Sequence, residues 1–249
     1  MPTSIETESR IIQRFDQVGD KSVAELAGES DFELRAILRF FGQPQPGAQL
    51  LDVGCGKGKF VPTLTQAGFS VTGVEPSAAL IRSAQSLHPH TRLIQASATA
   101  LPFANEVFDY VMCIETLEHV PDIDQAISEM VRVLKPGGRL IIIDKNISSL
   151  HPVHFAPTAI WKRVLEDTNR WMYPKDFPFR EQYFKPQSLR RLIAQHCSHV
   201  NIEFLRFEPE VKARTQPKRW LWLAHQGLTQ FIYRLVPQLS FYVAWQATK

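Results

Sequence analysis

The chain has 249 residues, of which 44% are hydrophobic and 21% charged, a composition that excludes a disordered or fibrous protein. Its three cysteines, Cys55, Cys113 and Cys197, are too few and too scattered for a disulfide framework or a Cys-x-x-Cys metal site. No run of 18 apolar residues occurs, so no transmembrane span is predicted. The first residues lack the basic and apolar regions of a secretory signal, and the predicted location is cytoplasmic.

The net charge of +3 is unevenly distributed along the chain. Residues 1–150 carry 13 Lys and Arg against 18 Asp and Glu, a net charge of −5. Residues 151–249 carry 15 Lys and Arg against 7 Asp and Glu, a net charge of +8. A basic C-terminal part favours an anionic substrate or an anionic surface, and the alternative is solvated basic side chains on helix faces.

Two helices are predicted before a break rich in Pro and Gly. The first covers residues 5–18, where apolar positions recur at helical spacing. Ser30 and Glu33 are spaced as a capping box for the second helix, which is predicted to end at Phe41. We interpret residues 1–46 as an N-terminal helical cap and the remainder as one larger domain.

Short apolar segments then alternate with helical patterns. Strands are predicted at residues 50–53, 70–75, 92–95, 108–113, 139–144, 200–207 and 240–246, and helices at 59–67, 77–86, 123–134 and 187–196. This alternation predicts a parallel sheet with helices on both faces. Residues 147–185, rich in Trp, Tyr and Pro, are interpreted as an inserted lid, and residues 218–236 as an additional helix.

The first predicted strand runs into the glycine loop Asp52-Val53-Gly54-Cys55-Gly56-Lys57-Gly58. The junction of first strand and first helix is where open α/β sheets bind ligands, and glycines allow a backbone to approach one closely. A dinucleotide-binding loop, Gly-x-Gly-x-x-Gly, would need a glycine at Lys59. The spacing Gly-x-Gly-x-Gly, with an acid two residues before it, is therefore a different motif.

Four further stretches follow in a fixed order. They are Gly-Val-Glu-Pro-Ser (73–77), Ala-Leu-Pro-Phe with Phe-Asp-Tyr-Val (100–111), Glu-Thr-Leu-Glu-His-Val-Pro-Asp (115–122) and Leu-Lys-Pro-Gly-Gly-Arg-Leu (134–140). Together with the loop, they resemble class I S-adenosylmethionine-dependent methyltransferases of the small-molecule type, similar to methyltransferase type 11 and ubiquinone-biosynthesis enzymes. The resemblance covers residues 50–144. It implies a Rossmann-like, seven-stranded, mostly parallel sheet with a reversed last strand, and S-adenosyl-L-methionine as cofactor.

The resemblance also implies which residues bind this cofactor. Gly54 and Gly56 would line its methionine part, where a Cβ would collide, and Asp52 would hold the loop and receive the ammonium group. Glu75 would accept from both ribose hydroxyls, because a carboxylate offers two oxygens. The implied set is Asp52, Gly54, Cys55, Gly56, Gly58, Glu75, Pro76, Ser97, Ala98 and Ile114.

One position departs from the family pattern. Members carry an Asp four residues before the Leu of Leu-Pro-Phe, where it accepts from the adenine amino group, and this chain has Ser97. A hydroxyl accepts more weakly than a carboxylate. The backbone N–H of Ala98 can still bond a ring nitrogen, and we expect a modest affinity for the cofactor.

His119 and His151 are the candidate catalytic bases. Glu115, Glu118 and His119 are spaced i, i+3, i+4, and on one helical face they could hold a divalent metal. Some quinone-biosynthesis O-methyltransferases use a similar Glu-x-x-Glu-His in this way. A general base at His119, and packing or hydrogen bonding, are the alternatives.

The predicted function is methyl transfer to a small molecule, at a hydroxyl oxygen. The stretch Cys113-Ile114-Glu115-Thr116 is not the Asn/Asp-Pro-Pro-Tyr/Phe of amino-directed nucleobase methyltransferases. The basic, aromatic C-terminal part favours an anionic, lipid-linked, glycan or quinone-like acceptor, with peripheral membrane contact. No basic stripe with interleaved aromatics indicates nucleic acid. The alternatives are a non-catalytic, cofactor-binding partner protein and a methyltransferase acting on RNA.

Overall fold

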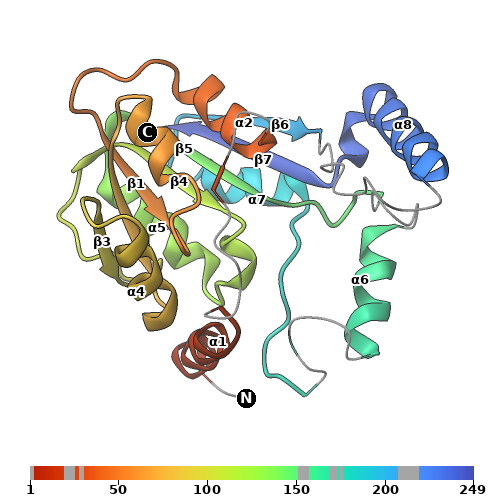
Figure 1. Ribbon diagram of the computed structural model, residues 1–249, viewed down its shortest axis with the longest axis horizontal. Coiled ribbons are helices and arrows are strands. Elements are labelled where there is room, and N and C mark those ends of the chain that lie inside the picture. The colour runs from red at the N-terminus through yellow and green to blue at the C-terminus, as the bar shows by residue number, and fades with distance from the viewer. Residues whose placement is uncertain are drawn as a thin grey trace.

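The computed structural model describes residues 3–19, 26–27, 31–150, 157–168, 173, 176–206 and 219–249, with the backbone alone for 18–19 and 219–226. Its centre is a seven-stranded sheet of order β3-β2-β1-β4-β5-β7-β6 (Figure 1). The strands are β1 (Gln49–Val53), β2 (Ser70–Glu75), β3 (Arg92–Gln95), β4 (Phe108–Ile114), β5 (Leu134–Lys145), β6 (His199–Leu205) and β7 (Tyr242–Thr248). Only β7 is reversed, antiparallel to both β5 and β6. The predicted Rossmann-like sheet is confirmed.

The strand positions follow the apolar segments of the sequence closely, with one extension. β5 begins at Leu134 rather than Arg139, because Leu134 pairs with Phe108 across a register shift in β4. Successive strand residues point to opposite faces, so Leu50 and Leu51 are both fully buried, each in a different hydrophobic cluster.

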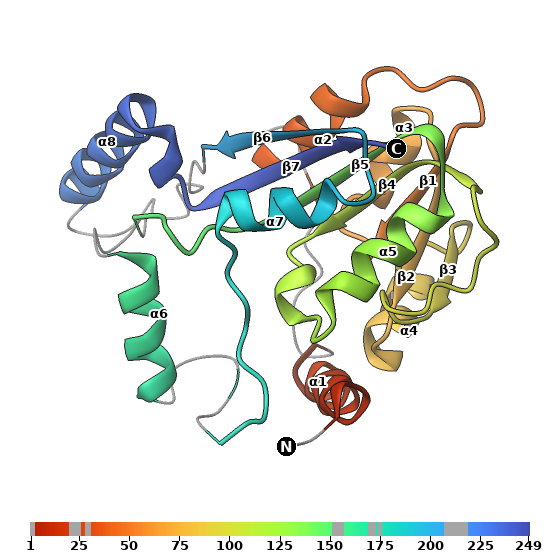
Figure 2. The ribbon, with the colours of Figure 1, turned by 180° about the vertical axis from the view of Figure 1, so that it is seen from behind.

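Helices cover both faces of the sheet, as predicted (Figures 1 and 2). The helices are α1 (Ser4–Gly19), α2 (Phe32–Phe41), α3 (Val61–Gln66), α4 (Ala78–Leu87), α5 (Ile123–Val133), α6 (Thr158–Asp167), α7 (Pro186–Ile193) and α8 (Arg219–Leu235), with 3₁₀ turns at Leu117–His119 and Pro237–Leu239. Buried side chains of α5 and α7 share one cluster with the sheet, and those of α2 and α3 share another. Helix α2 therefore belongs to the hydrophobic core on one face of the sheet.

The second helix is capped by a different residue from the one predicted. The Asp31 side chain accepts hydrogen bonds from the backbone N–H groups of Glu33 and Leu34, while Ser30 lies outside the described residues. Asp31 is one residue closer to the helix and its carboxylate reaches both N–H groups. Glu33 is buried and pairs with Lys59 instead of closing a capping box.

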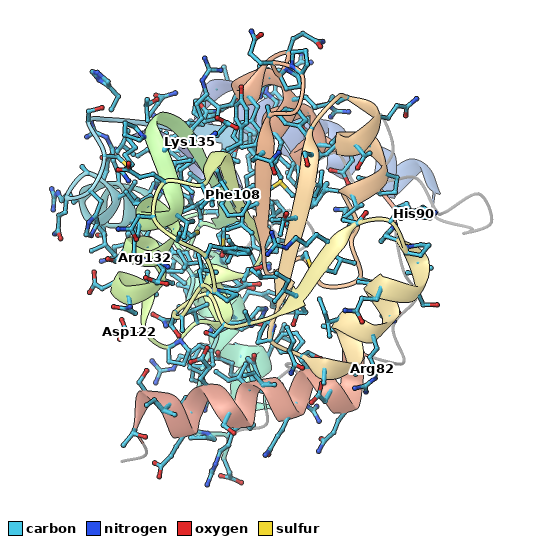
Figure 3. All side chains as sticks on the ribbon, turned by 90° about the vertical axis from the view of Figure 1, so that its left-hand side faces the viewer. Arg82, His90, Phe108, Asp122, Arg132 and Lys135 are labelled. Carbon is cyan, nitrogen blue, oxygen red and sulfur yellow. The ribbon has the colours of Figure 1, made fainter. Side chains whose placement is uncertain are left out.

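Helix α1 crosses the molecule at the carboxyl ends of the first strands (Figures 1 and 3). Its Asp16 accepts hydrogen bonds from Ser77 Oγ at 2.6 Å and from the Ala79 N–H at 3.0 Å, at the beginning of α4. Arg82 of α4 points toward this end of α1 (Figure 3) and its charge acts on Asp16. The N-terminal helix is therefore fixed to the edge where an α/β sheet binds ligands.

Helices α6 and α8 lie beside the far end of the sheet, away from α1 (Figure 2). Part of the predicted lid is described: Asn146 bridges to Phe184, and Leu150 bridges to Pro157 just before α6. Tyr233 of α8 is fully buried and donates to the Leu150 carbonyl at 2.7 Å. Among the described helices, none is both long and apolar enough to cross a membrane.

Candidate active site

The glycine loop turns sharply between β1 and α3. The N–H groups of Gly54 and Cys55 both donate to the Val74 carbonyl of β2, at 2.8 and 3.0 Å. Gly54 and Gly56 have positive φ angles of 77° and 52°, which residues other than glycine rarely adopt. A Cβ on Gly54 would lie 2.2 Å from Thr116, whereas a Cβ on Gly56 would meet nothing within 4 Å. The loop thus packs closely on one side and leaves open space on the other.

Two buried carboxyl groups lie beneath this loop. Glu75, at the end of β2, accepts hydrogen bonds from the N–H groups of Gly56 (3.1 Å) and Ser77 (2.9 Å). Asp52 is 2% exposed, and its Oδ2 has no hydrogen-bond partner within the described structure. Burial, helped by the nearby Glu75, raises the pKa of Asp52 to about 8, and burial also raises the pKa of Glu75.

A pocket opens between this loop and α1. Its wall consists of Glu8, Ile11, Ile12, Phe15, Gly54, Gly56, Glu75, Pro76, Leu80, Ala98, Ile114, Glu115, Thr116, His119 and Val120. The first four come from α1, which sequence reasoning did not assign to the site. The sequence does show that this helix has an apolar side, but it does not show which part of the molecule that side contacts. The pocket is therefore formed by the N-terminal helix α1 together with residues 54–120 of the sheet domain.

The predicted cofactor residues are divided by the structure. Gly54, Gly56, Glu75, Pro76, Ala98 and Ile114 line the pocket. Asp52, Cys55, Gly58 and Ser97 do not. Asp52 is buried beneath the loop, and the Cys55 side chain packs against a small apolar cluster. Gly58 lies against His88, and Ser97 contacts Glu8. The candidate base His151 lies outside the described residues.

The acidic stretch after β4 does not form one helical face. Glu115 has a positive φ of 47°, and the 3₁₀ turn begins only at Leu117. Lys145 of β5 pairs with Glu115 at 2.9 Å and with Glu118 at 2.5 Å. An ammonium group thus bridges the two carboxylates proposed as metal ligands.

A different trio could hold an ion. Ligand atoms of Glu118, His119 and Glu181 lie within 4.8 Å of one another. Glu181 comes from the predicted lid region and was not among the sequence candidates. Although burial opposes it, the charge of Lys145 and a hydrogen bond from His119 lower the pKa of Glu118 to about 2, so this carboxyl is anionic.

His119 is held by hydrogen bonds on both ring nitrogens. Its Nε2 lies 3.2 Å from Glu118 Oε1, and its Nδ1 lies 3.1 Å from the Tyr173 hydroxyl. The Phe15 ring of α1 makes an edge contact at 5.1 Å. A carboxylate can only accept, so Glu118 favours a proton on Nε2, and the Tyr173 hydroxyl can then donate to Nδ1, which also lies 3.8 Å from Glu181 Oε1.

Comparison with known proteins identifies this architecture. A family model described as a methyltransferase domain matches residues 51–142. Methyltransferase GfsG of Streptomyces halstedii is 40% identical over 105 residues, 39% of this chain and 38% of that protein. Demethylmenaquinone methyltransferase of Renibacterium salmoninarum is 32% identical over 120 residues, 48% of this chain and 51% of that protein. The chain carries a class I S-adenosylmethionine-dependent methyltransferase domain.

The fold of this methyltransferase domain is shared with solved structures. Geranyl diphosphate C-methyltransferase of Streptomyces coelicolor, solved with Mg²⁺, geranyl diphosphate and S-adenosyl-L-homocysteine, superposes with a TM-score of 0.67. The identity is 18%, over 97% of each chain. By contrast, the chain spans only about two fifths to half of the length of the two curated relatives.

The residues of this methyltransferase domain fit the cofactor of the class. Glu75 lines the pocket next to the open space at Gly56, and its two carboxyl oxygens each accept one backbone N–H, from Gly56 and from Ser77. Asp52, to which the resemblance assigns the ammonium group, lies beneath the loop and not on the pocket wall, and its Oδ2 has no hydrogen-bond partner among the described residues.

The buried acids make stability depend on pH. Burial raises the pKa of Asp52 to about 8 and that of Glu33 to about 7, so the unfolded chain releases both protons at lower pH than the folded protein. The free energy of unfolding should therefore fall as pH rises from about 4 to about 8. Asp52→Asn should flatten this fall and stabilise the cofactor-free protein at pH 8.

Urea unfolding of the cofactor-free protein at pH 5, 6.5 and 8 measures this dependence. Asp124→Asn, at an exposed acid in the first turn of α5, is the matched control and should retain the wild-type slope. A wild-type stability that rises with pH over this window would contradict the assignment.

Proposed function

We propose that the chain transfers a methyl group to a hydroxyl oxygen of a small, lipid-linked, quinol-like acceptor. The observation that carries the proposal is His119, at the pocket wall with its Nδ1 lone pair held ready by Glu118. A hydroxyl that stays protonated at neutral pH needs such a base, whereas an already nucleophilic carbon, nitrogen or thiolate does not. S-adenosylmethionine, when bound, supplies an activated methyl group on a sulfonium.

The chain's own residues would act by position and proton transfer. The acceptor hydroxyl would take the place of the Tyr173 hydroxyl at His119 Nδ1, 3.1 Å away. As the carbon–oxygen bond forms and the sulfur–carbon bond breaks, His119 would take the hydroxyl proton. The anionic Glu118 at Nε2 would stabilise the resulting imidazolium.

Water exclusion would come from the aromatic residues around this histidine. Ile11, Tyr173 and Phe179 form a buried cluster that Phe15 and Phe177 extend. The Tyr173 and Phe177 rings are stacked with centroids 4.9 Å apart. A dry, closed site aligns the acceptor with the donor and accounts for much of the rate in such transfers.

The acceptor class is supported by the relatives and by the surface. One relative is named a demethylmenaquinone methyltransferase, and this name supports a quinone-type acceptor. Residues 151–249 carry the net charge of +8. Apolar side chains are exposed on α6 and α8, namely Ile160, Val164, Leu228, Phe231 and Leu235. These features favour a peripheral membrane contact through which a lipid-linked acceptor enters.

Methyl labelling tests this function directly. Purified protein, methyl-labelled S-adenosylmethionine and a cell lysate are incubated, and the products are separated into organic, aqueous, protein and nucleic-acid fractions. We expect label in the organic fraction, with none when Gly54→Val protein is used, because its side chain would collide with Thr116. Aqueous label would contradict the lipid link, and label only in RNA or protein would contradict a small-molecule acceptor. Bound cofactor without transfer would support a non-catalytic role.

A further inference from the structure

The pocket wall combines two kinds of lining. Gly54, Gly56 and His119 belong to the part where the chemistry is proposed, and Pro76, Leu80, Ala98 and Ile11 contribute apolar atoms. Apolar lining suits a flat purine base, whose polar edge then needs hydrogen-bonding partners.

One carboxylate on the pocket wall contacts the residue that precedes Ala98. Glu8 of α1 lines the pocket, and its Oε1 accepts a hydrogen bond from Ser97 Oγ. Its Oε2 lies 3.4 Å from Thr99 Oγ1, and Ser97 Oγ in turn accepts from the Thr99 N–H at 3.0 Å. A carboxylate therefore lies against the position where the family carries an acid and this chain has a serine.

A second contact of helix α1, made by Asp16, fixes the position of the helix over the pocket. Asp16 lies two turns farther along α1 than Glu8, about 12 Å at 1.5 Å per residue. It accepts hydrogen bonds from Ser77 and Ala79, which are the chain neighbours of the pocket residues Pro76 and Leu80. These bonds lower the pKa of Asp16, so the anchoring group is anionic. The helix thus spans the pocket between two carboxylate contacts.

We propose that Glu8 is the acceptor for the exocyclic amino group of the cofactor's adenine. It would replace, from a helix far away in sequence, the acid that is missing at position 97. A carboxylate can only accept, so it favours a 6-amino purine, a donor, over a 6-oxo purine, which would place oxygen against oxygen. The inference rests on the proposed function only in taking S-adenosylmethionine as the cofactor.

The test compares two ligands that differ at this group. S-adenosyl-L-homocysteine carries the 6-amino group, and S-inosyl-L-homocysteine carries a 6-oxo group. Calorimetric titration gives the ratio of their dissociation constants for each protein. For the wild type, we expect the adenosyl ligand to bind at least tenfold more tightly. Glu8→Gln should reduce this ratio about tenfold or more, because an amide can donate to the 6-oxo group.

Two further variants identify the source of the effect. Glu6→Gln removes an exposed acid of the same helix that contacts the Thr3 N–H, and should leave the ratio unchanged. Ser97→Asp in the Glu8→Gln protein returns an acid to the same place and should restore the preference. A Glu8→Gln ratio equal to that of the wild type would overturn the assignment of Glu8. Failure of the wild type to bind either ligand would overturn the cofactor assignment and the proposed function with it.

Discussion

His119→Ala should lower kcat by about 10²- to 10⁴-fold, the usual contribution of a positioned general base. The imidazole is the group at the pocket wall whose lone pair is prepared by an anionic carboxylate. Its loss should leave the affinity for S-adenosyl-L-homocysteine within a few-fold of the wild type. The measurement is the initial rate of methyl transfer at saturating cofactor across pH 5.5–9.

The pH profile separates a base from a packing residue. Any pH dependence of the wild-type rate that comes from His119 should be absent in His119→Ala over the same range. His196→Ala, an exposed histidine just after α7, should retain both rate and profile. A His119→Ala enzyme with a wild-type profile would contradict the role of base and favour hydrogen bonding as the role of this residue.

Replacement of Glu75 should weaken cofactor binding strongly. Glu75→Gln should raise the dissociation constant of S-adenosyl-L-homocysteine about tenfold, and Glu75→Ala about 100-fold, because charge-assisted bonds to two hydroxyls are lost in steps. Glu75 also accepts from Gly56 and Ser77, so alanine frees the loop. Calorimetric titration gives both values.

Stability of the cofactor-free protein provides the control for Glu75. Burial raises the pKa of this carboxyl, so the empty protein carries a cost for its charge. Glu75→Gln should therefore match or exceed the wild type in thermal unfolding without ligand, while it binds the cofactor more weakly. Reduced stability together with unchanged affinity would contradict a ligand-binding role for this residue.

The sheet could be predicted from the sequence because its determinants are local. The segment 70–75 is short and almost wholly buried, whereas 92–95 buries Leu93 between polar ends, and the limits of both coincide with those of β2 and β3. The glycine loop was predictable for a similar reason, since its positive φ angles require the residue type seen at Gly54 and Gly56.

Contacts across the fold could not be predicted in this way. Lys145 bridges Glu115 and Glu118 because β4 and β5 are neighbours in the sheet, a pairing that no local pattern specifies. The contact of Glu8 with Ser97 joins residues 89 positions apart. Periodicity indicates that α1 has an apolar side, but only the fold determines that this side closes a pocket.

The glycine loop and α1 should together form one S-adenosylmethionine site, and hydrogen exchange of the wild-type protein with and without S-adenosyl-L-homocysteine tests this. We expect the ligand to slow exchange in residues 54–58 and in α1 together, because both contribute to the pocket wall. Slower exchange in the loop with α1 unchanged, or no change in either segment, would contradict it.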